Sequence, residues 1–161
     1  NSELSTIDTA ILIAGALTAA SYFDRGDSAE TEIRQLAESL YRRVDWQWAL
    51  DGKKTITHGW KPESGFLPGR WATGYCEAHI LYILALGSPT FAIDPAGYRE
   101  WTSTFEWKTL YETELFYAGP LFIHQLSQIW VDCRGIRDAA NCRADIDYFE
   151  NTRRATHVQR K

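Results

Sequence analysis

The sequence is poor in cysteine, and its three cysteines, Cys76, Cys133 and Cys142, do not describe a disulfide scaffold. Their spacing matches no zinc template, and the four histidines form no HExxH pattern. We therefore expect buried free thiols and no metal site. A phosphate-binding glycine loop, a dinucleotide fingerprint and a Ser/His/Asp order are also missing, so no cofactor is expected.

Basic charge is scarce as well. The 17 Lys and Arg residues are outnumbered by 21 Asp and Glu residues, which gives a formal net charge of −4. This balance argues against a nucleic-acid partner, because phosphate binding requires a basic surface. Cations do gather at the end of the sequence, where we expect them to complement the dipole of a last helix: Arg153, Arg154, His157, Arg160 and Lys161.

The longest apolar stretch, residues 7–23, has no Lys or Arg before it, although a signal peptide needs a basic region there. It is also shorter than the ~20 residues that cross a bilayer. We therefore expect no export signal and no membrane span in this segment. A helix that is apolar all round belongs in a core.

Aromatic residues, in contrast, are abundant: seven Trp, eight Tyr and seven Phe among 161 residues. Such rings pack cores, and exposed ones also stack on sugar faces. The length suffices for one domain with a real core, and no low-complexity linker divides it. We therefore predict a single domain over residues 1–161.

Hydrophobic periodicity predicts a mainly helical chain. Ser5, with Asp8 three residues on, should start a helix that ends near Phe23, and Asp27 or Ser28 should start a second one. Further helices are expected over residues 74–86, after Pro95, over 120–131 and over 146–159. In the helix over 120–131 the residues expected to face inward are Leu121, Phe122, Gln125, Leu126 and Ile129.

The pattern changes between Asp45 and Arg70. Trp46, Trp48 and Leu50 alternate with other residues, and Asp51-Gly52 is a hairpin turn signal. We predict one short β-hairpin near residues 48–58, followed by a loop. Periodicity alone does not choose among a helical bundle, a solenoid and a toroid.

Several short blocks occur in a joint order along nearly the whole sequence. They are Ser5-Thr6-Ile7-Asp8-Thr9-Ala10, Tyr41-Arg42-Arg43-Val44-Asp45-Trp46, His58-Gly59-Trp60, Gly74-Tyr75-Cys76-Glu77-Ala78, Leu84-Ala85-Leu86-Gly87-Ser88-Pro89, Tyr117-Ala118-Gly119-Pro120-Leu121-Phe122, Arg134-Gly135-Ile136 and Asp147-Tyr148-Phe149-Glu150-Asn151. With these blocks the chain resembles the bacterial glucoamylase-like domain family. That family is similar to endo-β-1,2-glucanases and to a domain of cyclic β-1,2-glucan synthases.

The resemblance implies an all-α fold that forms part of an (α/α)6 toroid, with one short β-hairpin. It implies an oligo- or polysaccharide partner, a β-glucan bound in the cleft, and a setting in the bacterial periplasm or envelope. It also implies that this chain is an internal, incomplete piece of the domain. An incomplete toroid exposes apolar inner faces, so we expect the chain to associate with itself. The sequence departs from the family pattern at Glu112-Thr113, where a glycine and an aromatic residue are common.

Glycoside hydrolysis requires an acid and a second carboxylate. Glu77 falls in the first turn of a predicted apolar helix, and the sequence alone favours a helix-start glutamate without chemistry. The resemblance implies instead that Glu77 is the general acid. Asp8 reads as a helix-start carboxylate too, and the resemblance makes it a sugar contact.

A group of residues around the predicted hairpin and the Glu77 helix has side chains suited to sugar binding: His58, Trp60, Arg70, Trp71 and Tyr75. Ordinary packing explains Trp60 and Trp71 equally well, and a structural role is the simpler explanation of His58. His124 could line the cleft or be buried and paired. Two functions stay open: a glycoside hydrolase or transglycosylase acting on a β-glucan, and a truncated, inactive carbohydrate-binding segment.

Overall fold

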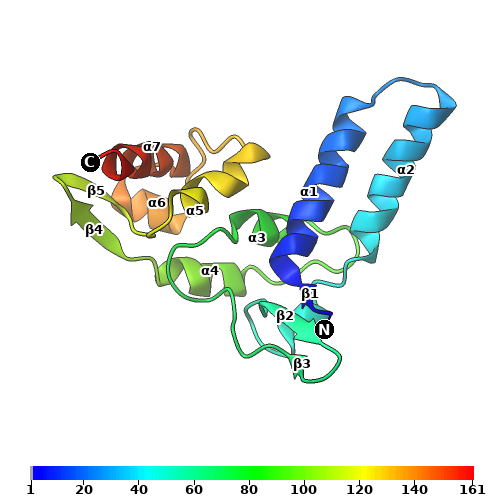
Figure 1. Ribbon diagram of the computed structural model, residues 1–161, viewed down its shortest axis with the longest axis horizontal. Helices are drawn as coiled ribbons and strands as arrows, with labels where there is room; N and C mark the ends of the chain where they lie inside the picture. Colours follow the sequence, from blue (N-terminus) through cyan, green and yellow to red (C-terminus); the bar gives the residue numbers. More distant parts are fainter. Residues whose placement is uncertain (1) are drawn as a thin grey trace. The chain divides into compact units, whose positions relative to one another are not determined.

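The computed structural model describes residues 2–161, of which about half are helical (Figure 1). Two small sheets accompany the helices. Contacts divide the chain into two compact units. The first comprises the described residues up to Arg70 together with Ile80–Pro95, and the second comprises Trp71–His79 and Ala96–Lys161. The mainly helical prediction is confirmed.

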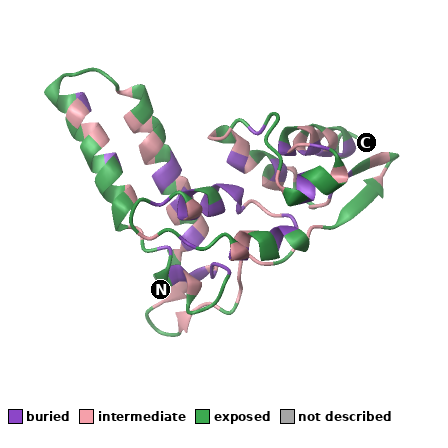
Figure 2. Ribbon diagram, turned by 180° about the vertical axis from the view of Figure 1, so that it is seen from behind, coloured by how far each residue is buried: buried purple, intermediate pink, exposed green. Residues whose placement is uncertain are grey.

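The first unit is built on two long helices, α1 (Thr6–Tyr22) and α2 (Ser28–Arg43), which pack against each other. Both begin where the sequence predicts. The Ser5 side chain accepts from the Asp8 amide and the Asp27 side chain accepts from the Glu30 amide, which satisfies amides that have no partner within the helix. Figure 2 shows that only short parts of both helices are buried, including Ala10, Ile13 and Ala37.

A three-stranded antiparallel sheet lies beside the start of α1. Its strands are β1 (Leu4–Ser5), β2 (Gly59–Lys61) and β3 (Gly65–Phe66), in that order. Leu4 pairs with Trp60, and Trp60 pairs with Phe66. Gly59 is required here because a Cβ on it would lie 2.5 Å from the Leu4 carbonyl oxygen.

The prediction of a β-hairpin that turns at Asp51-Gly52 is wrong. Trp48–Leu50 form a short 3-10 helix, η1, whose Trp48 amide donates to the Asp45 carboxylate across 2.7 Å. Asp51 then takes a left-handed conformation, with φ of 49°, and ends that helix. The Asp-Gly pair therefore terminates a helical turn instead of joining two strands.

Helix α3 (His79–Leu86) supplies the remaining core of the first unit from Ile80 onward. Leu81 and Tyr82 are fully buried, as are Trp46 and Ile56 of the same unit. The Tyr41 hydroxyl of α2 donates to the Leu84 carbonyl of α3 across 2.8 Å.

After the Trp71–His79 segment, the second unit resumes with α4 (Ala96–Ser103), which follows Pro95 as predicted. It continues with a hairpin that the sequence did not indicate. Its strands are β4 (Trp107–Leu110) and β5 (Thr113–Phe116), which pair antiparallel. The two turn residues, Tyr111 and Glu112, have φ of 47° and 63°. Left-handed conformations at both positions are typical of the tight turns that match strand twist.

The predicted helix over 120–131 is broken into α5 (Leu121–Gln125) and the 3-10 helix η2 (Leu126–Ile129). Its inward face was predicted only in part, because Leu121 does pack against the core formed by Leu115, Ala155 and Val158. Phe122 and Ile129 are exposed, whereas His124 and Ser127 are buried. The buried positions, His124 and Ser127, carry polar side chains, so a prediction based on the spacing of apolar residues could not identify them as buried.

Helix α6 (Ala139–Ala144) is anchored by Asp138. The Asp138 carboxylate accepts from two amides of α6 and from the hydroxyls of Tyr98 and Tyr148, at 2.7 and 2.6 Å. Burial opposes ionisation of Asp138, but the hydrogen bonds from Tyr148, the Asn141 amide and Tyr98 hold its pKa below the usual range.

The last helix, α7 (Tyr148–Gln159), begins at Asp147 and packs on β5 and α5. Asn151 is fully buried and its Oδ1 accepts from the Phe116 amide across 2.7 Å, which ties α7 to the hairpin. Leu115 of β5 forms a small core with Ala155 and Val158.

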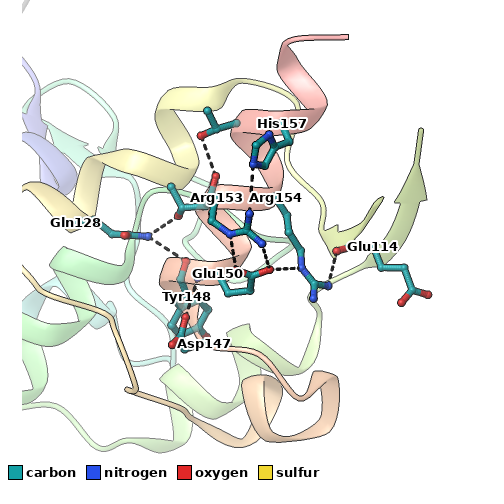
Figure 3. A network of polar contacts seen from close by, with 10 residues as sticks. Glu114, Gln128, Asp147, Tyr148, Glu150, Arg153, Arg154 and His157 are labelled. Atoms are coloured by element: carbon teal, nitrogen blue, oxygen red, sulfur yellow. Dashed lines mark hydrogen bonds and ion pairs between the residues drawn. The ribbon is translucent and has the colours of Figure 1, made fainter. Parts of the chain in front are cut away.

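Of the basic cluster, His157 lies in the last turn of α7 and Arg160 is its C-cap, as the dipole role requires, whereas Arg153 and Arg154 lie further from the end of the helix. Arg153 and Arg154 both bind the Glu150 carboxylate, and Arg154 also donates to the Glu114 carbonyl (Figure 3). The hydrogen bond from Arg153, with that from Arg154, lowers the pKa of Glu150 to about 2. For Arg153 and Arg154 the predicted dipole role is corrected to ion pairing, and Arg154 also braces the hairpin.

All three cysteines are free thiols. Cys133 is buried and Cys76 is half-buried, but Cys142 is exposed, so the prediction of buried thiols fails there. Across residues 2–161 no helix is both long and apolar enough to cross a membrane.

Candidate functional site

Glu77 lies in a turn directly before α3, and the helix predicted from residue 74 begins only at His79. Gly74 has φ of 69°, which is incompatible with a right-handed helix at that point. Glu77 is half-buried, and because α3 starts only at His79, its carboxylate is carried by a loop and not by a helical turn.

This loop is held at both ends. The Gly74 carbonyl accepts from Trp101 Nε1 across 2.8 Å, and the Gly74 amide donates to Thr104 Oγ1 across 2.8 Å. At the other end the Ser127 hydroxyl donates to the Glu77 carbonyl across 3.1 Å. Trp101 is fully buried, so the backbone that presents Glu77 is fixed to the core of the second unit.

Tyr75 does not face solvent but lies in an aromatic core. Its ring stacks on His124 at 4.9 Å and 22°, and contacts Phe105 at 5.1 Å. Burial raises the pKa of the Tyr75 hydroxyl. The packing of the Tyr75 ring therefore anchors the Glu77 loop to this core.

His124, for which the sequence left two alternatives open, is buried and paired in the structure. One ring nitrogen lies 3.3 Å from the Ala118 carbonyl and the other lies 3.3 Å from Asn151 Nδ2. Burial lowers the pKa of His124. The imidazole is thus packed beside Tyr75.

His79 was given no role by the sequence, yet it occupies the centre of the same aromatic core. Its ring lies 4.3 Å from Tyr148 and 4.8 Å from Trp101. Its Nε2 is buried and has no hydrogen-bond partner among residues 2–161. Burial lowers the pKa of His79 to about 4, and burial raises the pKa of the neighbouring Cys76 thiol to about 12.

Two other predicted sugar contacts, Trp71 and Asp8, are more accessible than Tyr75 and His124. Trp71 is half-buried at the start of the Glu77 loop. Asp8 is exposed in the first turn of α1. Its carboxylate is available to a ligand.

His58 and Trp60 belong to the small sheet of the first unit. The His58 amide donates to the Gly69 carbonyl, and a Cβ on Gly69 would lie 2.5 Å from His58 Nδ1, so the ring packs tightly on that glycine. Trp60 is half-buried and its ring lies 6.2 Å from Trp48. The sequence treated Trp48 only as a strand residue, but it is 41% exposed and 4.6 Å from Phe66.

Arg70 uses its guanidinium within the protein. It donates to the Leu50 carbonyl at 2.6 Å, to the Thr55 carbonyl, and to the Thr55 hydroxyl at 3.1 Å. These bonds close the loop that follows η1. A structural role accounts for all of the contacts of this side chain.

The candidate residues are thus distributed over both units. Glu77, Tyr75, His124 and Trp71 belong to the second, and Asp8, His58, Trp60 and Arg70 to the first. Within the part of the chain that the structure describes, no group of three or more His, Cys, Asp or Glu side chains could hold a metal ion.

A family model described as "Putative glucoamylase", of the Glycoamylase family, matches residues 70–161, which include the Glu77 loop and all of α4 to α7. The chain belongs to the Glycoamylase family. The resemblance deduced from the sequence is therefore confirmed.

The relatives of this glycoamylase-family chain include an exo beta-1,2-glucooligosaccharide sophorohydrolase (non-reducing end) from Parabacteroides distasonis, which is 24% identical over 96% of this chain. The crystal structure of a putative glucoamylase from Bacteroides fragilis is 29% identical, with a TM-score of 0.85. An endo-beta-1,2-glucanase from Chitinophaga pinensis, solved with sophorotriose and glucose, is 27% identical, also with a TM-score of 0.85.

These matches span 96% of this chain. They span only 24% of the sophorohydrolase and 38% of each of the two solved chains. The similarity therefore concerns one segment of larger proteins.

Proposed function

We propose that this chain is part of a glycoside hydrolase that cleaves a β-1,2-linked glucan. The observation that carries the proposal is the family match over residues 70–161, which contains the loop that presents Glu77. The names of the sophorohydrolase and the endo-glucanase support the β-1,2 linkage. Exo or endo cleavage is left open by these two relatives, which differ in that respect.

Glu77 is proposed as the general acid. Glu77 is half-buried, and the backbone of its loop is held by Trp101, Thr104 and Ser127. Such fixation is what proton transfer to a leaving oxygen requires. Asp8 is proposed as a sugar contact, because its exposed carboxylate can accept from hydroxyl groups. Of the aromatic candidates, Trp60 and Trp71 are accessible enough to contact a sugar ring, whereas Tyr75 and His124 act from within the core.

The fold proposal follows the same comparison. TM-scores of 0.85 and 0.86 over 96% of this chain support one incomplete domain that forms part of an (α/α)6 toroid. A structure of the complete protein tests it, and a chain path that closes no ring of helices would exclude it.

The decisive experiment is Glu77→Gln in the complete protein that contains this segment. The change keeps size and removes the transferable proton, so turnover of β-1,2-glucan should fall by about 10²- to 10⁴-fold while binding of sophorotriose persists. The matched control is Glu32→Gln, an exposed glutamate of α2, which should leave turnover unchanged. Asp8→Asn should weaken binding more than it lowers turnover.

A second candidate function is glucan binding without cleavage, which the accessible rings of Trp60 and Trp71 would support without any role for Glu77. It predicts that the wild-type protein binds sophorotriose and releases no reducing ends. Retention of more than about a tenth of wild-type turnover by Glu77→Gln would remove Glu77 from the acid role, since that loss equals only about 1.4 kcal/mol.

A further inference from the structure

The β4–β5 hairpin uses its two faces differently. On one face Leu110 and Leu115 pack against Ala155 and Val158 of α7. On the other face Trp107 and Phe116 are direct cross-strand partners, with rings 5.0 Å apart at 76°. Trp107 is nevertheless 36% exposed, so the hairpin presents part of an indole ring to solvent.

A hollow of about 450 Å³ lies on this second face, between the hairpin and α6. Its aromatic wall consists of Phe105, Trp107 and Phe116, and its polar groups come from Ser103, Glu114 and Arg143. The volume falls within the range of roughly 300–1,000 Å³ that is usual for small-molecule sites. None of the lining residues belongs to the loop that carries Glu77.

Glu114 and Arg143 are the charged groups of this hollow. Glu114 and Phe116 are two residues apart on β5, so their side chains lie on the same face of the hairpin. Figure 3 shows the Glu114 carboxylate directed away from α7. Its backbone carbonyl accepts a hydrogen bond from Arg154. Neither side chain makes a hydrogen bond or an ion pair with any residue in the range 2–161. Both are therefore free to bind a ligand.

We propose that the hollow is a second sugar-binding site, separate from the loop of Glu77, which holds a neutral pyranose ring of the glucan chain. The identity of the sugar polymer rests on the proposed function. The indole of Trp107 provides an apolar surface for one face of the ring. The Arg143 guanidinium donates to ring hydroxyls and the Glu114 carboxylate accepts from them.

The charge of the site favours a neutral ligand. One guanidinium and one carboxylate cancel, so an anionic ligand would meet Glu114 and a cationic ligand would meet Arg143. Aromatic walls with a few planar polar groups suit a polyhydroxylated ring, which has apolar faces and a polar rim.

The test measures binding of sophorotriose and of longer β-1,2-glucooligosaccharides to the complete protein bearing Glu77→Gln, by isothermal titration calorimetry. Adding Trp107→Ala should raise the Kd of the longer ligands at least about tenfold, which corresponds to about 1.4 kcal/mol. Trp107→Phe should restore most of the affinity because it keeps a ring. Arg143→Ala, at an exposed position, should weaken binding without disturbing the packed wall.

The matched control is Tyr111→Ala, which removes an exposed ring from the turn of the same hairpin and outside the hollow. It should leave Kd unchanged. Unaltered binding in both Trp107→Ala and Arg143→Ala, with glucan turnover intact in the protein that retains Glu77, would overturn the second site and leave the proposed function standing. Absence of glucan binding and turnover in the wild-type protein would overturn both.

Discussion

The Ser127 hydroxyl donates a hydrogen bond to the backbone carbonyl of Glu77, although 50 residues separate the two in sequence. Ser127 is buried in η2, and Glu77 lies in the turn before α3. The bond therefore fixes the backbone from which the proposed acid extends, without engaging its carboxyl group. Ser127 is a positioning residue in this respect.

Ser127→Ala in the complete protein should lower kcat while KM changes little. A hydrogen bond of this kind contributes about 0.5–1.5 kcal/mol, which corresponds to a loss of up to about tenfold in kcat. Steady-state kinetics on a β-1,2-glucan measure the two constants separately. The matched control is Ser21→Ala, which removes an exposed hydroxyl bond to a backbone carbonyl in α1 and should change neither constant. An effect confined to KM would show that Ser127 does not position the acid.

Stability should fall in mild acid because of His79. Its folded-state pKa of about 4 lies below its ordinary value of 6.5, so the folded protein keeps the ring neutral while the unfolded chain takes up a proton. The free energy of unfolding should therefore be unaffected by His79 above pH 6.5. It should then fall by up to about 1.4 kcal/mol per pH unit toward pH 4, roughly 3 kcal/mol in all.

Urea unfolding at pH 7 and pH 5 measures this effect. His79→Phe keeps an aromatic ring in the core and removes the titrating group, so the loss between the two pH values should shrink. His157→Gln alters an exposed histidine of the same unit and should keep the wild-type difference. An unchanged difference in His79→Phe would mean that other groups, such as the buried His124, dominate the acid response.

Self-association of the chain should depend on α2. Leu36 and Leu40 are 57% and 43% exposed and lie one helical turn apart. Replacing both by Lys removes apolar surface worth about 1.5–3 kcal/mol for each fully buried leucine, so the dissociation constant of any self-complex should rise well over tenfold. Sedimentation velocity over a range of concentrations measures it. Gln35→Lys with Ser39→Lys adds the same charge at exposed positions of the same helix and should have the smaller effect.

The sequence predicted the helices whose signals are local. Ser5 and Asp27 accept from the amides of the first turns, and these caps could be located from residue type and spacing alone. The Asp51-Gly52 signal misled because a turn dipeptide does not say whether a strand partner exists. The β4–β5 hairpin escaped notice because Tyr111 and Glu112 adopt left-handed conformations without the usual glycine or asparagine.

The candidate site was found through the family resemblance, not through spacing. Glu77 has no distinguishing neighbour in sequence, and Trp101, which fixes its loop, lies 27 residues from Gly74. Long-range contacts of this kind cannot be read from periodicity. Nor could periodicity show that the Tyr75 ring stacks on the distant His124 within an aromatic core.

Two of the hydrogen bonds to the β4–β5 hairpin, one from α7 and one from Lys161 just after it, do not depend on the identity of the hairpin side chains. Arg154 donates to the carbonyl of Glu114 and Lys161 donates to the carbonyl of Tyr111, across 2.9 and 3.3 Å. Every residue offers such an oxygen, so the turn can exchange its residues and keep both anchors. Exchange of residues at the tip is limited instead by its backbone, because Tyr111 and Glu112 hold left-handed conformations that glycine and asparagine adopt more easily than other residues.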